Sequence, residues 1–282
     1  MIRHDIFCDW SEWPSLSARI PLGEPASEEY EYGSTPNELR GWKAGAAMNE
    51  SHRESTSDAG RSDHVDPLVV GAYGFKPRFR GRLHQVAFFV SLPAGFWLLA
   101  GAQTTTARIA VAIYWASLAG LFAASSSYHL FAKSERAVTW MRRLDHSMIF
   151  VLIAGTYTPF GLVVLPRAWG IPMLVAMWVT ALAGIIMKMV RVTAEHTKSG
   201  SWLYSVLGWS AVIALPKLLD QMGPARMALL LGGGFLYTVG AIILGKRRPD
   251  PRPRVFGYHE VWHAFTIAAG ACHFVLVAMV TH

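Results

Sequence analysis

The chain has 282 residues, of which 52% are hydrophobic and only 16% are charged. Soluble domains carry about 25% charged residues, so this composition argues against an ordinary soluble domain. A net charge of +7 on so apolar a chain suits a membrane protein with cationic loops better than a nucleic-acid-binding protein.

Charge divides the chain into two parts. Residues 1–75 carry 13 acidic and 6 basic residues, whereas residues 76–282 carry 20 basic and 6 acidic ones. The first part is rich in Ser, Gly, Pro and Glu and shows no sustained periodicity, which predicts a disordered acidic extension. It begins without an apolar core of the kind found in signal peptides, so we expect no cleavable leader.

Seven apolar stretches in residues 76–282 are long enough to cross the roughly 30 Å core of a bilayer as helices. They predict an all-α membrane protein built as a seven-transmembrane helix bundle. Pro216-Lys217 shortens the fifth stretch, and Pro159 in "GTYTP" predicts a kink in the third. The stretches are residues 85–103, 109–130, 146–165, 169–187, 201–219, 227–245 and 259–281.

Basic residues indicate how these spans run. Sixteen Lys and Arg residues flank one side of the predicted spans and three flank the other. Cytoplasmic loops carry the excess of positive charge, so we expect a multi-pass protein of the plasma or inner membrane with a cytoplasmic N-terminus and an external C-terminus. The three residues on the outer side are Arg108, Arg167 and Arg226.

Ionisable side chains inside a membrane are costly and mark functional sites. In "SSSYH", Ser125 and His129 lie one helical turn apart at the inner end of the second span. Asp145 opens the third span, and His259 and His263 lie in the first turns of the seventh. Span direction therefore predicts that these residues share one depth in the cytoplasmic leaflet.

Three imidazoles with an open fourth position are typical of catalytic zinc. His259 and His263 also belong to an HExxH motif, in which Glu260 would be the general base of a peptidase. Such a site needs a third ligand, and His129 supplies it better than the donors downstream. Asp145 is then placed to accept a proton from water, and Ser125 to hydrogen-bond a ligand or the substrate carbonyl.

The blocks "SSSYHLF", "RRLDHSMIFVLIAGTYTPF" and "HEVWHAFTIAAGACHF" resemble the hemolysin III branch of the progestin and adipoQ receptor family, which includes the adiponectin receptors. The resemblance covers residues 76–282. It implies a seven-helix bundle with a buried zinc held by His129, His259 and His263, lined by Asp145 and Ser125. It also implies a ceramidase-like hydrolysis of an amide-linked membrane lipid.

Simpler interpretations stay open for several residues. Asp145 would cap the third helix, and the serines around Ser125 would let helices approach closely. Glu260 would face the cytoplasmic surface or pair with a loop arginine. His273 is expected to face the bundle as an interhelical or channel residue, and His84 and His146 to lie at the interface without a role in the site.

Two further functions compete with lipid hydrolysis. In one, zinc is structural, and the protein is a lipid-homeostasis sensor, a receptor or a cytolytic protein. In the other, the chain is an intramembrane metallopeptidase that uses Glu260. The three alternatives share the metal and differ in whether Asp145, Glu260 or neither performs chemistry.

Overall fold

The structure, a computed structural model, describes residues 75–191 and 202–282. The predicted acidic extension, residues 1–75, lies outside the described residues except for Phe75. Regular structure in the described part is helical, apart from one bridge between Arg252 and Phe256.

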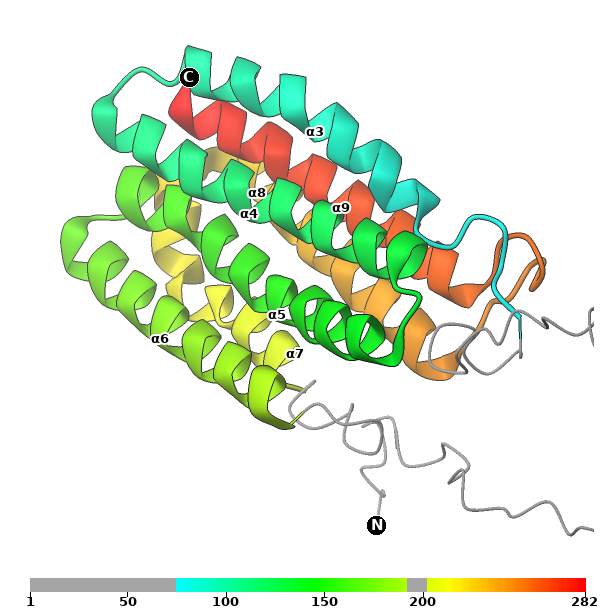
Figure 1. The fold of residues 1–282 in the computed structure, drawn as a ribbon. Coiled ribbons are helices and arrows are strands. Elements are labelled where there is room, and N and C mark those ends of the chain that lie inside the picture. The colour runs from blue at the N-terminus through cyan, green and yellow to red at the C-terminus, as the bar shows by residue number, and fades with distance from the viewer. Residues whose placement is uncertain (1–74, 192–201) are drawn as a thin grey trace, which may run out of the picture. The chain divides into compact units, whose positions relative to one another are not determined.

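The helices form one bundle (Figure 1). Helix α9 packs against α3, α4 and α8, and α5 lies between α4 and α6. In chain order they are α3 (Arg82–Gly101), α4 (Thr105–Phe131), α5 (Glu135–Pro159), α6 (Arg167–Arg191), α7 (Trp202–Trp209), α8 (Ala211–Lys246) and α9 (Tyr258–Thr281). A π-helical turn, η2 (Phe160–Val164), follows α5 directly after Pro159, where the sequence predicts a kink.

Six helical segments of the described residues are long and apolar enough to cross a membrane. This finding confirms the all-α membrane fold. The count of seven spans is not confirmed, because the predicted stretches 201–219 and 227–245 fall in one continuous segment, Trp202–Lys246. The other five predicted stretches each correspond to one helical segment.

The segment Trp202–Lys246 folds back on itself. Its 45 residues would span roughly 68 Å as a straight helix. Tyr204 and Ala241 nevertheless line the same cavity, which a straight helix excludes. The reversal lies at Gly223, whose φ of 71° and ψ of 171° are not helical. Figure 1 shows the two arms, yellow and orange, running in opposite directions.

The position of this reversal corrects one expectation. Pro216-Lys217 was expected to shorten the fifth stretch, but the helix continues through Pro216. Proline removes a backbone donor without forcing the chain to turn back. Glycine at position 223 provides the left-handed backbone that the reversal requires.

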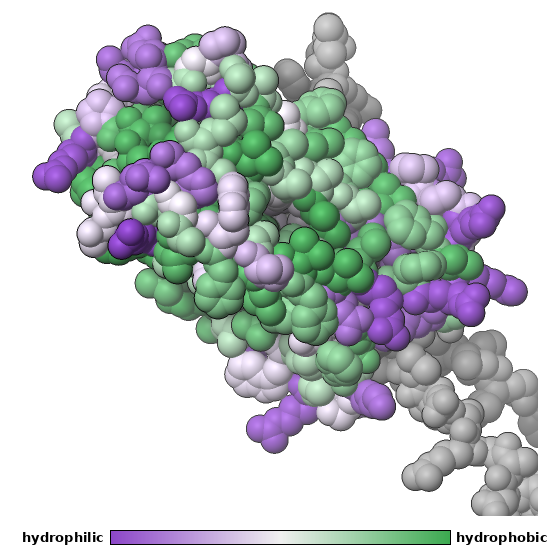
Figure 2. Space-filling view, turned by 90° about the horizontal axis from the view of Figure 1, so that it is seen from above, coloured by the Kyte–Doolittle hydropathy of each residue, from purple (hydrophilic) through white to green (hydrophobic). Residues whose placement is uncertain are grey.

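The outer surface of the bundle is apolar, as lipid contact requires. Large hydrophobic side chains are widely exposed on the outer helices, among them Phe89 on α3, Val179 on α6 and Ile213 on α8. On the face that Figure 2 shows, hydrophobic residues cover most of the middle, and hydrophilic ones gather towards the ends. Exposed apolar area on this scale marks a surface that water does not cover.

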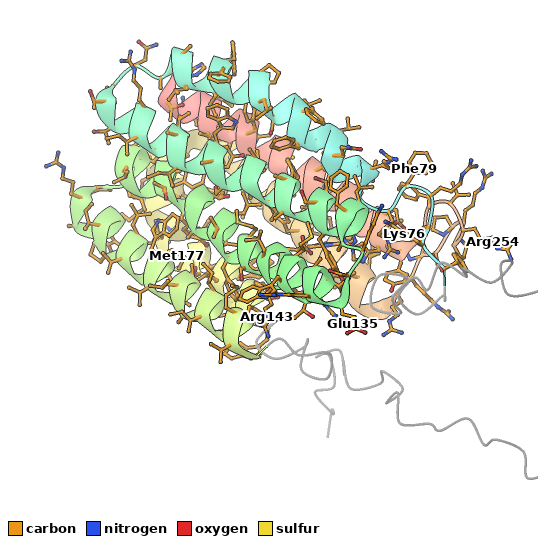
Figure 3. The ribbon with its side chains drawn as sticks, in the orientation of Figure 1. Lys76, Phe79, Glu135, Arg143, Met177 and Arg254 are labelled. Carbon is orange, nitrogen blue, oxygen red and sulfur yellow. The ribbon has the colours of Figure 1, made fainter. Side chains whose placement is uncertain are left out.

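Backbone hydrogen bonds tie the segment before α3 to the segment before α9. The amides of Arg78 and Phe79 donate to the carbonyls of Arg254 and Val255, at 3.1 and 3.2 Å. Lys76, Phe79 and Arg254 therefore lie together at this end of the bundle (Figure 3). Burial and the nearby charges of Arg80 and Arg82 lower the pKa of Lys76, because positive charge is crowded here.

Candidate metal centre

Three histidines from two distant parts of the chain converge at this end of the bundle. His129 lies in the last turn of α4, and His259 and His263 lie in the first two turns of α9. One nitrogen from each ring lies within 4.8 Å of the others. His129 and His263 are buried, with 5% and 2% of their surface exposed. The predicted juxtaposition of these three rings is confirmed.

The three rings fit a zinc ion. Zn–N bonds of about 2.0–2.1 Å in a tetrahedron place neighbouring nitrogens about 3.3 Å apart. The Nε2 atoms of His129 and His259 are 3.2 Å apart. Nδ1 of His263 is buried without a hydrogen-bond partner among the described residues, which leaves that ring free to orient towards an ion. Neutral imidazoles are also a ligand type that suits zinc.

Glu260 is held away from peptidase chemistry by its contacts. It is fully buried, and one carboxylate oxygen accepts a hydrogen bond from Nε of Arg80. The other accepts from the backbone amide of Gly257 at 2.8 Å, which caps α9. Both oxygens are therefore engaged. Of the two simpler readings, pairing with a loop arginine is confirmed and exposure at the surface is wrong.

The Arg80–Glu260 pair also balances charge beside the histidines. The guanidinium of Arg80 is close enough to interact electrostatically with His129 and His259. A buried positive charge would oppose a cation at the same place. Because Glu260 neutralises Arg80, the surroundings remain suitable for a metal ion.

Asp145 and Ser125 meet across the interface between α4 and α5. The Ser125 hydroxyl lies close enough to the Asp145 carboxylate to interact with it. Ser125 is buried, whereas the Asp145 side chain keeps 17% of its surface exposed. Ser125 lies one helical turn from His129 on α4. Ser125 therefore connects Asp145 to the histidine cluster, because it lies on the same helix as His129.

The structure excludes a capping role for Asp145. Helix α5 begins at Glu135, well before the predicted start at 146, and its cap is Ser134, whose side chain accepts from the amide of Ala137. Asp145 thus lies inside the helix, where no free amide needs it. The early start follows from "RAVTWMRRL", which continues the helix beyond the apolar stretch.

An apolar cavity of about 210 Å³ lies deeper in the bundle. Helices α4, α5, α7, α8 and α9 all contribute to its wall. Its few polar lining groups include Thr266, Tyr237 and His273. This volume is below the roughly 300–1,000 Å³ of sites for drug-sized ligands, so the cavity suits a slender apolar chain.

Helical spacing places the polar site at one end of this cavity. Leu121 lines it one turn from Ser125, and Ile149 lines it one turn from Asp145. On α9, Thr266 lines it on the same helix face as His259. On each of these three helices, the site residue thus lies one or two turns from a cavity-lining residue. In all three cases it lies towards the end of the bundle that holds the histidines.

Three other histidines, His146, His273 and His84, can be compared with the positions that the sequence predicts for them. His146 bonds the carbonyl of Arg142 within its own helix, at 2.9 Å, but its Nδ1 also lies 3.7 Å from Oδ2 of Asp145, so the ring is not remote from the site. His273 links α9 to the carbonyl of Leu230 on α8 at 3.3 Å, as expected of an interhelical residue, and it also lines the cavity. His84 was expected at the interface, but it is buried and stacks on His263. Only a tertiary contact reveals this position.

Comparison with known proteins identifies the family. The model of the haemolysin-III-related family matches residues 73–274. Hemolysin-3 of Bacillus cereus is 34% identical over 200 residues, which cover 69% of this chain and 86% of that protein. A hemolysin-3 homolog of Bacillus subtilis (strain 168) is 32% identical over 198 residues, covering 69% and 89%. No solved structure matches.

These matches cover the three sequence blocks and the helices that carry the three histidines. They agree with an all-helical bundle whose outer surface is apolar. The protein is therefore a member of the haemolysin-III-related family of multi-pass membrane proteins.

Proposed function

We propose that the protein binds zinc through His129, His259 and His263 and hydrolyses an amide-linked, ceramide-like membrane lipid. The observation that carries the proposal is the position of the three rings, whose ligand atoms lie within 4.8 Å of one another. They stand at the end of an apolar cavity, beside a carboxylate and a hydroxyl. A lipid with a polar linkage and an apolar chain matches both parts of this arrangement.

Each residue then has a defined task. Zinc held by three imidazoles supplies Lewis acidity and makes water nucleophilic near neutral pH. Asp145 accepts the proton of the attacking water. Ser125, which lies close enough to interact with the Asp145 carboxylate, helps to orient it. The cavity receives the acyl chain and keeps water from it.

The site requires a defined membrane topology. We propose seven crossings, with the arms before and after Gly223 each crossing once, a cytoplasmic N-terminus and a location in the plasma or inner membrane. Roughly 68 Å of helix is about twice the bilayer core, which supports two crossings in Trp202–Lys246. The metal site then lies in the cytoplasmic leaflet, at the depth of lipid headgroups.

A non-enzymatic role is the second candidate. Two relatives carry the name hemolysin, which favours a cytolytic protein, or a lipid sensor or receptor, with structural zinc. The peptidase alternative loses support, because both oxygens of Glu260 are engaged by Arg80 and Gly257.

The deciding experiment compares wild type with Asp145→Asn in detergent or vesicles. Zinc content is measured together with hydrolysis of a panel of ceramides and other amide-linked lipids. We expect Asp145→Asn to keep its zinc and lose about 10²–10⁴-fold in turnover, the usual contribution of a general base. Asp220→Asn, an exposed aspartate on α8, is the matched control and should behave as wild type.

Two results would decide against hydrolysis. Wild-type protein with full zinc that cleaves no lipid of the panel would favour the non-enzymatic role. Equal turnover by Asp145→Asn and wild type would remove Asp145 from the reaction.

A further inference from the structure

A fourth histidine, His84, lies against the candidate metal centre. It is in the first turn of α3, and only 3% of its surface is exposed. Its ring stacks on that of His263, with centroids 3.9 Å apart and planes 17° apart. His84 is also close enough to His129 and His259 to interact with them electrostatically.

The ring nitrogens of His84 are poorly satisfied. Both are buried, and neither makes a hydrogen bond of ordinary geometry among the described residues, although the backbone of His263 is close enough to interact with the ring. Phe122 covers the ring at a centroid distance of 5.1 Å. A phenylalanine would fill such a place without leaving polar atoms unsatisfied, and buried polar atoms in folded proteins are usually satisfied. The imidazole therefore indicates a polar partner beyond the described residues.

His84 is not placed to be a fourth ligand. The lone pair of a ring nitrogen lies in the ring plane, so the lone pairs of two nearly parallel rings do not converge on one ion. His84 accordingly stands outside the group whose ligand atoms lie within 4.8 Å of one another. The three-histidine arrangement would leave a fourth position for a ligand, and His84 lies against one of the three rings, that of His263.

We infer that His84 hydrogen-bonds the small polar ligand, a water or an anion, that occupies the fourth position of the metal centre. This inference rests on the proposed metal centre and not on the lipid reaction. His84 thereby adds a hydrogen bond to the ligand without contributing a bond to the metal.

The test uses the full chain loaded with Co²⁺, whose visible spectrum reports its ligands, and azide as the probe. Wild-type binding of Co²⁺ tests the centre itself. His84→Phe keeps an aromatic ring against His263 but removes both nitrogens. We expect Co²⁺ affinity within about 3-fold of wild type and azide affinity about 10-fold weaker, the size of one hydrogen bond.

His84→Leu also removes both ring nitrogens and keeps the test decisive if the Phe variant does not fold: its azide affinity should again be about 10-fold weaker. Two amide variants then test whether the hydrogen bond can be restored. The side-chain amide of Asn reaches the place of Nδ1, and that of Gln reaches the place of Nε2. We expect His84→Asn or His84→Gln to bind azide within about 3-fold of wild type, because one of them restores the hydrogen bond.

His273→Phe is the matched control. His273 is also a buried histidine with an unpartnered Nδ1, but it lies ten residues, about 15 Å, from His263 along α9. The His273→Phe variant should bind azide with the same affinity as wild type. Unchanged azide binding in His84→Phe overturns the inference. So does loss of Co²⁺ itself in folded His84→Phe, which would make His84 a ligand. Wild type that binds no Co²⁺ removes the metal centre instead.

Discussion

Adjacent residues of the HExxH segment have different tasks because a helix points them in different directions. His259 and His263 lie one turn apart and face His129. Glu260, between them in sequence, is rotated towards the chain before α3 and meets Arg80. In peptidases this spacing places the glutamate beside zinc as a base. Here it places Glu260 in an ion pair with Arg80 beside the site.

The ligand assignment predicts that single substitutions remove the metal. His129→Ala or His263→Ala should weaken zinc binding by more than the 10–100-fold that loss of a supporting partner usually costs, because each removes a ligand. Zinc content of purified protein, measured by mass spectrometry after dialysis, checks this. His282→Ala is the control, since that ring lies at the other end of α9 and bonds the carbonyl of Leu98. Full zinc in both ligand variants would reject the site.

The Arg80–Glu260 pair predicts coupled stability. Arg80→Met or Glu260→Gln each leaves a buried partner unpaired and should lower the free energy of unfolding by about 3–5 kcal/mol. The double variant should lose clearly less than the sum, because neither charge remains. Denaturation in detergent measures all three. Strictly additive losses would show that the two side chains act independently.

At the scale of elements, short breaks in the helices decide where polar groups meet. The boundary between α7 and α8 is one such break. Tyr157 of α5 provides hydrogen-bond partners for the backbone groups that the break leaves free. Its hydroxyl accepts from the amide of Ala211 at 2.6 Å and donates to the carbonyl of Gly208 at 2.8 Å. Within a membrane, freed backbone groups need such partners. Tyr157 thereby also forms part of the cavity wall.

The reversal at Gly223 predicts a position-specific effect of alanine. Gly223→Ala should destabilise the protein by about 1–3 kcal/mol, since its backbone lies in a region open almost only to glycine. The space around a new Cβ there is free, so the cost comes from the backbone alone. Thermal unfolding in detergent measures it.

Gly232 provides the control, because it lies within a helical arm of the same segment and its Cβ would also meet open space. Gly232→Ala should be neutral or should stabilise by up to about 1 kcal/mol, as alanine does in helices. Equal effects of the two substitutions would contradict a reversal at Gly223.

At the scale of the whole molecule, the number of crossings determines on which side the chain ends. An odd number places the termini on opposite sides, and an even number places them together. From the charge bias we propose that the basic loops lie in the cytoplasm. The site then faces the inner leaflet only if the arms around Gly223 both cross.

Reporter fusions test this topology. A phosphatase that is active only outside should be active when fused after Gly223 or after His282, and inactive after Arg248, because seven crossings alternate these positions. Cysteine labelling at the same sites with an impermeant reagent is the independent check. An inactive fusion after His282 would indicate six crossings and place both termini inside.

The polar residues of the site were predictable in part. His129, His259 and His263 follow from span direction and spacing, since the last turn of α4 and the first turns of α9 lie at the same end of the bundle. The partner of Glu260 and the burial of His84 were not predictable. Both depend on how the segment before α3 packs on α9, more than 170 residues later in the chain.

The sequence alone determined the membrane class, the approximate helices, the family and the three histidines, because bilayer thickness and helical period act along the chain. Only the tertiary structure decided that Glu260 pairs with Arg80, that Asp145 lies inside a helix near Ser125 instead of capping it, and that His84 stacks on His263. Those choices depend on side-chain packing between distant helices, and no local pattern encodes which faces will meet.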